Sequence, residues 1–292
     1  MDIKPYQYTS NTFDIKQAPT AIPADYADQK DVIKAKIAEN IKKLSKYQKK
    51  LYAQRNYGIL VIFQAMDAAG KDSMIAHIMS GVNPTGFKVA NFKQPTSEDL
   101  AHDYLWRINR NLPARGEIGV FNRSYYEDVL ISRVHPEILL PAKLPLIKKV
   151  GDVTEKLFAG RYEDIRQFEK YLTRNGFIIM KFFLHISKAE QKKRFEARIN
   201  IPDKNWKFSE SDIAERQYWH QYQTAYEKAI NATATRYNPW YVIPSDDKWY
   251  SRLVVSNIIN QRLRSLPLAY PEVTAEQKNA LFDALTQLNN GD

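Results

Sequence analysis

The first long apolar run of the chain is followed by a short turn whose residues are suited to binding phosphate. This turn reads Ala65-Met66-Asp67-Ala68-Ala69-Gly70-Lys71-Asp72-Ser73. It matches the phosphate-loop (Walker A) pattern G-x-x-x-x-G-K-S/T at Gly70 and Lys71, whereas Ala65 replaces the first glycine. Backbone N–H groups at such a turn, and at the start of the helix after it, form a cradle for anions. The alternative is an ordinary strand–helix turn with a solvated lysine. We expect Lys71 to reach a transferred phosphate, and the phosphate cradle to comprise Ala68, Ala69, Gly70, Asp72 and Ser73.

Asp67 is unusual in a phosphate cradle, because its carboxylate would repel a bound anion. A divalent cation that bridges carboxylate and phosphate removes this repulsion, and hard cations prefer oxygen ligands. Asp67 therefore favours phosphoryl transfer with Mg²⁺, Mn²⁺ being a second candidate, over simple anion binding. Its alternative role is to cap the following helical turn.

A second group of polar residues follows a later apolar run, at Asn122 and Arg123. In phosphate-loop folds an acidic residue at this kind of strand end holds the metal, and Asn122 offers an oxygen ligand without the charge. Glu127 and Asp128 lie one helical turn further on, where either could supply the missing negative charge or simply favour the helix N-terminus. Arg123 would face a ligand at the carboxyl edge of the sheet. We expect the metal ligands to be Asp67, Asn122 and Glu127.

A basic segment at residues 198–212 is interrupted by Pro202 and lies between two helical patterns. It carries Arg198, Lys204 and Lys207, which would close over phosphates as a lid, with Arg198 acting on the charge of the transition state. A surface loop with solvated cations is the alternative.

The elements that would position these residues alternate between short apolar runs and helical patterns. The apolar runs predict five strands, at 58–63, 87–92, 118–121, 177–186 and 240–243. Apolar residues at spacings of three and four predict helices at about 31–55, 72–81, 97–110, 124–132, 152–175, 188–199, 210–232, 248–265 and 274–289. Such alternation predicts an α/β fold of three layers (α/β/α) around a parallel five-stranded sheet. We expect one phosphate-loop domain over 31–292, after an irregular N-terminal arm at 1–30.

The composition limits the classes of protein to which this chain can belong. Cysteine is absent from the 292 residues, which excludes a disulfide scaffold, a thiol nucleophile and cysteine-bound metal, and the five histidines show no close ligand spacing. The 43 Lys and Arg exceed the 33 Asp and Glu, and the resulting charge of +10 suits an acidic partner. Lysines of the helix predicted at 31–55 form either a solvated face or part of a field that attracts a polyanion. The apolar run Tyr57–Met66 is too short to span a membrane and the N-terminus lacks a signal-peptide pattern, so we expect a cytoplasmic protein.

Several segments, in the same order along about residues 30–265, resemble the polyphosphate kinase 2 family. The segments that carry the resemblance are Phe63-Gln64-Ala65-Met66-Asp67-Ala68-Ala69-Gly70-Lys71, Ser80-Gly81-Val82-Asn83-Pro84, Phe92-Lys93-Gln94-Pro95-Thr96, His102-Asp103-Tyr104-Leu105-Trp106-Arg107, the stretch 121–130, the lid from Arg198 to Phe208, and the stretch 238–249.

This resemblance implies a thymidylate-kinase-like fold that transfers phosphoryl groups reversibly between inorganic polyphosphate and nucleotides with Mg²⁺. It implies the roles given above for Asp67, Lys71, Arg123 and the lid cations. Many members have aspartate where this chain has Asn122, and together with Glu127 this resembles the subfamily that phosphorylates both AMP and ADP, giving ADP and ATP. The resemblance also implies a homo-oligomer, a dimer or tetramer, and nucleotide contacts at Asn83, Lys93, Arg107 and Arg133.

Two other functions compete with this interpretation. An ATP-dependent nucleoside monophosphate kinase would need two nucleoside pockets, whereas a polyphosphate donor needs no adenine pocket. A basic nucleic-acid-binding protein would leave the phosphate loop without a role, and no recognised nucleic-acid module is present. We therefore expect neither nucleic acid nor a membrane as a partner.

Overall fold

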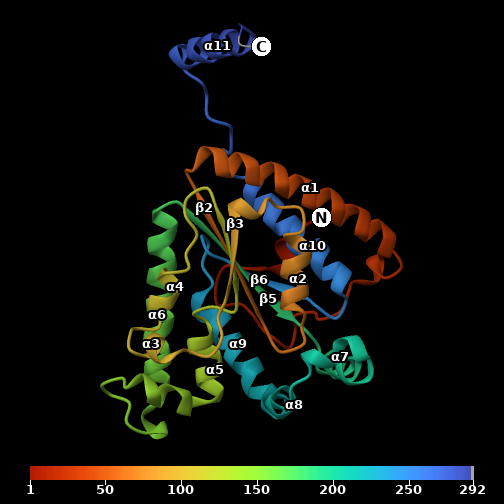
Figure 1. Ribbon diagram of the computed structural model, residues 1–292. Helices are drawn as coiled ribbons and strands as arrows, with labels where there is room; N and C mark the ends of the chain where they lie inside the picture. The colour runs from red at the N-terminus through yellow and green to blue at the C-terminus, as the bar shows by residue number, and fades with distance from the viewer. Residues whose placement is uncertain (291–292) are drawn as a thin grey trace.

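The computed structural model describes residues 1–290, and within that range six strands form one sheet in the order β1-β6-β5-β2-β4-β3 (Figure 1). Five of these strands are parallel to one another, as the apolar runs predicted. The strand bounds are β1 Gln7–Tyr8, β2 Gly58–Ala65, β3 Phe87–Asn91, β4 Ile118–Asn122, β5 Phe177–His185 and β6 Trp240–Pro244.

The central strand β2 explains how the site is assembled. All of its residues are buried, because β4 and β5 pair with its two edges and helices cover both faces. Phe63 of β2 lies in register with Asn122 of β4 and with Phe182 of β5. The turn that follows β2 therefore lies beside the turn that follows β4, at the carboxyl edge of the sheet.

Helices cover the two faces of the sheet in separate groups (Figure 1). On one face α1 packs along α10, and α10 also contacts α2; on the other face α5, α6 and α9 pack together. Helices α7 and α8 lie beyond the carboxyl edge, at the lid. The helix bounds are α1 Lys30–Gln54, α2 Lys71–Ile78, α3 Ser97–Leu100, α4 Trp106–Asn109, α5 Glu127–Val134, α6 Glu155–Arg174, α7 Lys188–Asn200, α8 Glu210–Glu215, α9 Trp219–Thr233, α10 Lys248–Arg264 and α11 Ala275–Asn290.

Two of the predicted helices are interrupted. The segment predicted as one helix at 97–110 forms the short helices α3 and α4, and between them the Asp103 carboxylate accepts a hydrogen bond from the Leu105 N–H at 2.9 Å. Local bonding of this kind competes with helix formation. The segment predicted at 210–232 forms α8, a 3₁₀ turn at Arg216–Tyr218 and α9.

The first 30 residues are more ordered than the irregular arm that we expected. Their strand β1 pairs antiparallel with β6, which makes the sheet six-stranded instead of five-stranded. The side chain of Phe13 is buried in the main core, and its backbone N–H and C=O bond to Asn231 on α9. This strand could not be predicted from the sequence, because two residues are too few to show a period.

The C-terminal helix α11 lies apart from the rest of the fold (Figure 1). It exposes the apolar side chains of Leu281, Phe282, Leu285 and Leu288. Within the described part of the chain, no helix has the length and apolar character needed to cross a membrane.

Candidate active site

The turn after β2 has the backbone of an anion cradle. Ala68 and Gly70 both have left-handed φ angles, of 60° and 102°, and α2 begins at Lys71. A non-glycine residue in this region is strained, and such strain is often found at functional sites. The Lys71 ammonium donates to the Ala65 carbonyl at 2.9 Å, so that its side chain folds back over the loop.

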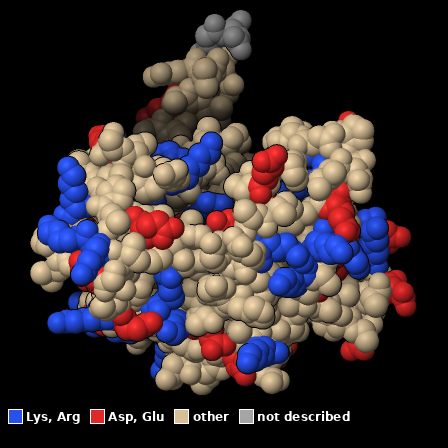
Figure 2. Space-filling model, turned by 90° about the horizontal axis from the view of Figure 1, so that it is seen from below, with Lys and Arg blue, Asp and Glu red and all other residues tan. Residues whose placement is uncertain are grey.

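A cavity of about 600 Å³, here called the phosphate cavity, lies in front of this loop. It brings together most of the residues that the sequence nominated: the loop from Asp67 to Ser73, Lys93, Asn122, Arg123, Arg198, Lys204 and Lys207. Arg194 and Lys248 also line it. Lysine and arginine side chains outnumber the two carboxylates, Asp67 and Asp72, so the cavity suits a polyanion. Figure 2, which views the molecule from below, shows Lys and Arg gathered in patches on this side.

Asn122 and Arg123 meet the loop as the strand register requires. The Asn122 amide nitrogen donates to Asp72 Oδ1 at 2.6 Å and to Asn91 Oδ1 at 2.9 Å. Arg123 also has a left-handed φ, of 63°, and its guanidinium lies 3.4 Å from Asp67 Oδ1. These contacts connect the ends of three neighbouring parallel strands in one polar cluster.

Three charged groups at this point shift one another's protonation. Burial lowers the pKa of Lys71, and the nearby Arg123 lowers it further, while Asp67, Glu127 and Asp72 act in the opposite direction. Burial raises the pKa of Glu127, opposed by Arg123 and Lys71. Glu127, in turn, is the main cause that raises the pKa of Arg123. Perturbed groups that interact in a cleft are typical of a catalytic site.

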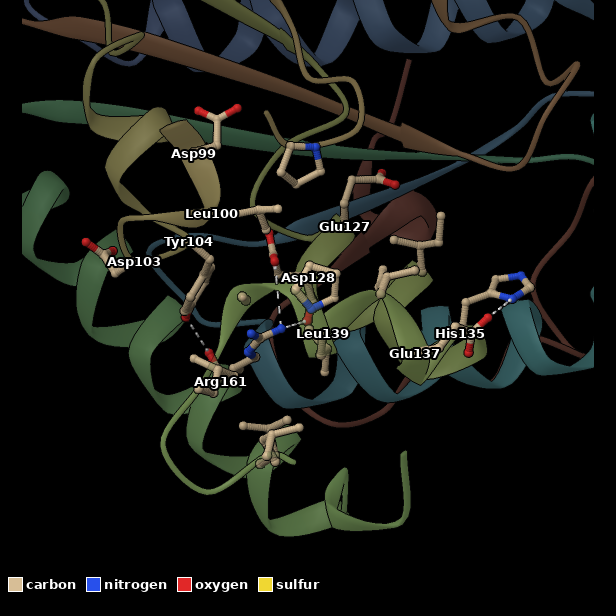
Figure 3. Close-up of a pocket in the computed structure, with 18 of the residues that line it drawn as sticks. Asp99, Leu100, Asp103, Tyr104, Glu127, Asp128, His135, Glu137, Leu139 and Arg161 are labelled. Carbon is tan, nitrogen blue, oxygen red and sulfur yellow. Dashed lines mark hydrogen bonds and ion pairs between the residues drawn. The ribbon is translucent and has the colours of Figure 1, made fainter. Parts of the chain in front are cut away.

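A second, larger cavity of about 1170 Å³, here called the acceptor cavity, adjoins the first (Figure 3). Arg123, Phe92, Lys93 and Gln94 line both cavities, whereas Glu127 lines only the acceptor cavity. Apolar residues from the segment 138–147 form part of its wall, among them Ile138, Leu139, Leu144, Leu146 and Ile147.

The floor of the acceptor cavity is held by a polar contact between α5 and α6. Arg161 lies 3.7 Å from the Asp128 carboxylate and donates to its backbone carbonyl at 2.6 Å (Figure 3). Burial raises the pKa of Asp128 to about 6, although Arg161 opposes the shift. Of the two acids in the first turn of α5, Asp128 is therefore tied to α6, while Glu127 lies beside Arg123.

The predicted nucleotide contacts separate into two groups. Lys93 and Arg107 line the acceptor cavity. Arg133 instead pairs with Glu155 at 2.5 Å, and Asn83 accepts a hydrogen bond from the Thr85 N–H at 3.1 Å; neither lines the phosphate cavity or the acceptor cavity. Their nucleotide contacts remain predictions.

Sequence reasoning missed several residues of the site. Arg194 and Lys248 line the phosphate cavity from α7 and α10, and Gln64, with its amide nitrogen toward Glu127, donates to Glu127 Oε1 at 2.8 Å. Arg194 stands four residues before the predicted lid arginine, on the same helical face, which was a usable signal. The wall at 138–147 has no helical or strand period that could have revealed it.

The oxygen ligands at the phosphate cavity fit a magnesium ion that is shared with phosphates. No set of three or more His, Cys, Asp and Glu in the described residues is arranged to hold a metal. Mg²⁺ often takes only one or two carboxylates and completes its shell with water and substrate phosphates. Asp67 lines the cavity with 32% of its side chain exposed, and the Asn122 nitrogen is engaged, so its amide oxygen is the atom available to a cation. Glu127 lines the neighbouring cavity instead.

The basic segment at 198–212 is closed by an ion pair between residues near its two ends. The Arg198 guanidinium pairs with Asp212 at 2.8 Å, and the segment between them includes a 3₁₀ helix, Pro202–Lys207, in which Trp206 is 78% exposed.

If this segment closes on phosphates, polyphosphate should protect residues 198–212 from limited proteolysis, and Arg198→Ala should reduce both protection and turnover. Mass spectrometry of the fragments would locate the cuts; equal cleavage with and without polyphosphate would contradict a lid.

Comparisons with known proteins show the family of this chain. The sequence model of the family described as polyphosphate kinase 2 (PPK2) matches residues 27–267. The chain is 47% identical to the ADP-polyphosphate phosphotransferase of Rhodopseudomonas palustris, over 94% of each chain. It is 45% identical to the AMP/ADP-polyphosphate phosphotransferase of Meiothermus ruber, over 81% of this chain and 84% of that one.

The fold gives the same result. A crystal structure of polyphosphate kinase 2 from Arthrobacter aurescens TC1 superposes with a TM-score of 0.86, at 37% identity and over 96% of both chains. This chain belongs to the polyphosphate kinase 2 family.

Proposed function

We propose that this protein transfers the terminal phosphoryl group of inorganic polyphosphate to AMP and to ADP, reversibly and with Mg²⁺. The observation that carries the proposal is the meeting of two unlike cavities at Arg123, one lined by cations and the other with an apolar wall. Polyphosphate suits the first, and a nucleotide suits the second, with its phosphates toward Arg123. The names of the Rhodopseudomonas and Meiothermus relatives support this choice of substrates.

In this arrangement the reaction is an in-line displacement. An oxygen of the acceptor's terminal phosphate forms a bond to the last phosphorus of the donor, and the bridging P–O bond behind that phosphorus breaks. Polyphosphate leaves one unit shorter. Lys71 and Arg123 lie where they can neutralise charge on the transferred group, and Arg198 can add to this when the lid closes. Bound Mg²⁺ would supply further neutralisation of phosphate charge from the side of Asp67 and Asn122.

The two cavities also argue against an ATP-dependent nucleoside monophosphate kinase. Such an enzyme binds a nucleoside at both donor and acceptor positions, yet the phosphate cavity is walled by the lysines and arginines of the lid, α7 and α10.

The deciding experiment incubates AMP or ADP with long-chain polyphosphate and Mg²⁺ in the absence of ATP. Formation of ADP and then ATP is expected from AMP. If neither forms, while ATP phosphorylates AMP, the protein is a monophosphate kinase.

Asp67→Asn should weaken the apparent affinity for Mg²⁺ by about tenfold or more, because a carboxylate ligand becomes a neutral amide. The measurement is the Mg²⁺ dependence of the initial rate at saturating substrates, after the chelated wild-type enzyme has been shown to lose and regain activity. Asp14→Asn, on the N-terminal segment, is the control. An unchanged Mg²⁺ dependence in Asp67→Asn would remove this residue from the metal site.

We also propose that the protein forms a homo-oligomer in which α11 packs against a second copy. An isolated helix of this length is marginal in water, and Leu281, Leu285 and Leu288 form a stripe with the spacing of a two-helix seam. Light scattering should give a multiple of the 34.0 kDa chain mass, and Leu281→Glu with Leu285→Glu should reduce it. A monomeric wild type would contradict this proposal.

A further inference from the structure

Arg194 is buried behind the phosphate loop, with 8% of its surface exposed. Its Nη1 donates to the carbonyl oxygens of Ala68 at 3.1 Å and Ala69 at 2.8 Å. Its Nη2 donates to the carbonyls of Ser245 at 2.6 Å and Asp246 at 3.0 Å, just after β6. Its Nε donates to Glu190 at 2.8 Å. A guanidinium has five N–H groups, and these five acceptors account for all of them. Arg194 therefore has no donor left for a bound phosphate.

Gln191, three residues earlier on α7, extends the same contact. Its amide nitrogen donates to the Asp67 carbonyl at 3.0 Å, and its side chain is also buried. Gln191 and Arg194 together hold the carbonyls of three successive loop residues, Asp67, Ala68 and Ala69. In a trans peptide the N–H points opposite to the C=O of the same unit. The N–H groups of Ala68, Ala69 and Gly70 are thus turned away from α7. The Ala69 N–H donates to the Met66 carbonyl at 3.2 Å, which leaves those of Ala68 and Gly70 for an anion.

This contact also answers a difficulty in the loop sequence. Ala68 adopts a left-handed φ of 60°, a conformation that alanine disfavours. Without an external restraint, Ala68 would relax toward a right-handed conformation and turn its peptide groups. The bonds from α7 supply this restraint, because they hold the carbonyls of Asp67 and Ala68, on either side of the Ala68 Cα, and that of Ala69.

We propose that Gln191 and Arg194 are positioning residues that hold the phosphate loop in its anion-binding conformation. They touch the loop and leave the phosphates to Lys71 and to the N–H groups of Ala68 and Gly70. Because Arg198 follows Arg194 by four residues on α7, the helix that carries the lid cation is also the helix that fixes the loop. The proposal rests on the proposed function for its substrate, polyphosphate, and its test uses binding as well as turnover.

The main variant is Arg194→Lys, which keeps a positive charge but cannot reach two pairs of carbonyls with one ammonium. We expect the Kd for inorganic tripolyphosphate, measured by calorimetry without nucleotide, to rise about tenfold. This factor corresponds to the free-energy cost of a left-handed alanine, which the bonds from Arg194 no longer offset. The KM for polyphosphate should rise in parallel, while the KM for ADP changes less than about twofold, since the acceptor cavity is intact. Arg166→Lys is the matched control, because Arg166 also donates to a backbone carbonyl, that of Ala232, away from both cavities.

The decisive step repeats Arg194→Lys in an Ala68→Gly background. Glycine adopts left-handed φ readily, so the ratio of Kd values between Arg194→Lys and its parent should be several-fold smaller in this background. An equal ratio in both backgrounds, wild-type tripolyphosphate binding in Arg194→Lys, or an equal loss of ADP binding would each overturn the proposal. If Arg194→Lys fails to fold by thermal melting, Gln191→Met carries the same test. Because tripolyphosphate binding needs no turnover, failure of the proposed transferase activity would show separately in the wild-type assay.

Discussion

Lys71→Ala is expected to lower turnover by two or more orders of magnitude while the protein stays folded. Lys71 is the first residue of α2 and lines the phosphate cavity, with Arg123 and Asp67 nearby. Removing one preorganised electrostatic contact from a transition state typically costs about 2.7–4 kcal/mol. The ammonium donates only to the Ala65 carbonyl among the described residues, so the fold loses little with it.

The measurement is kcat with saturating polyphosphate and ADP, beside the melting temperature of the same preparation. Lys46→Ala, on the exposed face of α1, is the matched control for loss of one positive charge and should keep wild-type kcat. A folded Lys71→Ala protein with near-normal kcat would show that the loop lysine does not act on the transferred group. A rise in KM alone would assign it to ground-state binding of polyphosphate.

The sequence predicted the parts of this fold that repeat a period or a motif. The five parallel strands were evident because each is a short, continuous apolar run, and β2 is buried along its whole length. Asp67, Lys71, Asn122 and Arg123 could be placed together because they end neighbouring parallel strands, whose carboxyl ends share one edge. The resemblance to the family supplied the substrates, which no periodicity could.

The remaining features depend on contacts between segments far apart in the chain. β1 exists because residues 7 and 8 meet β6, more than 200 positions later. The left-handed conformations of Ala68 and Arg123 are imposed on residues that do not favour them, so propensity points the wrong way. Asp67 and Glu127 are both carboxylates, so their residue types could not show that Asp67 lines the phosphate cavity and Glu127 the acceptor cavity.

That division bears on how one site could phosphorylate both AMP and ADP. The two acceptors differ by one phosphate, whereas the donor position at the loop is fixed. Glu127 lies in the acceptor cavity beside Arg123, where a carboxylate can hold a cation against the phosphates of the shorter acceptor. Asn122, being neutral, lowers repulsion on the donor side. We therefore infer that Glu127 compensates for the missing phosphate of AMP.

Glu127→Gln should lower kcat/KM for AMP by about a hundredfold, the scale of losing one charge-stabilising group, and affect ADP much less. Initial rates would be measured for AMP and ADP separately, each with excess polyphosphate. Asp128→Asn is the matched control, because this neighbouring acid of α5 lines the same cavity but is bound to Arg161, so both acceptors should respond alike. A wild type that uses only one acceptor would end the proposal of dual specificity. Equal losses for AMP and ADP in Glu127→Gln would instead show that Glu127 serves both reactions. A residue that compensates for the shorter acceptor must change the ratio of kcat/KM for AMP to kcat/KM for ADP.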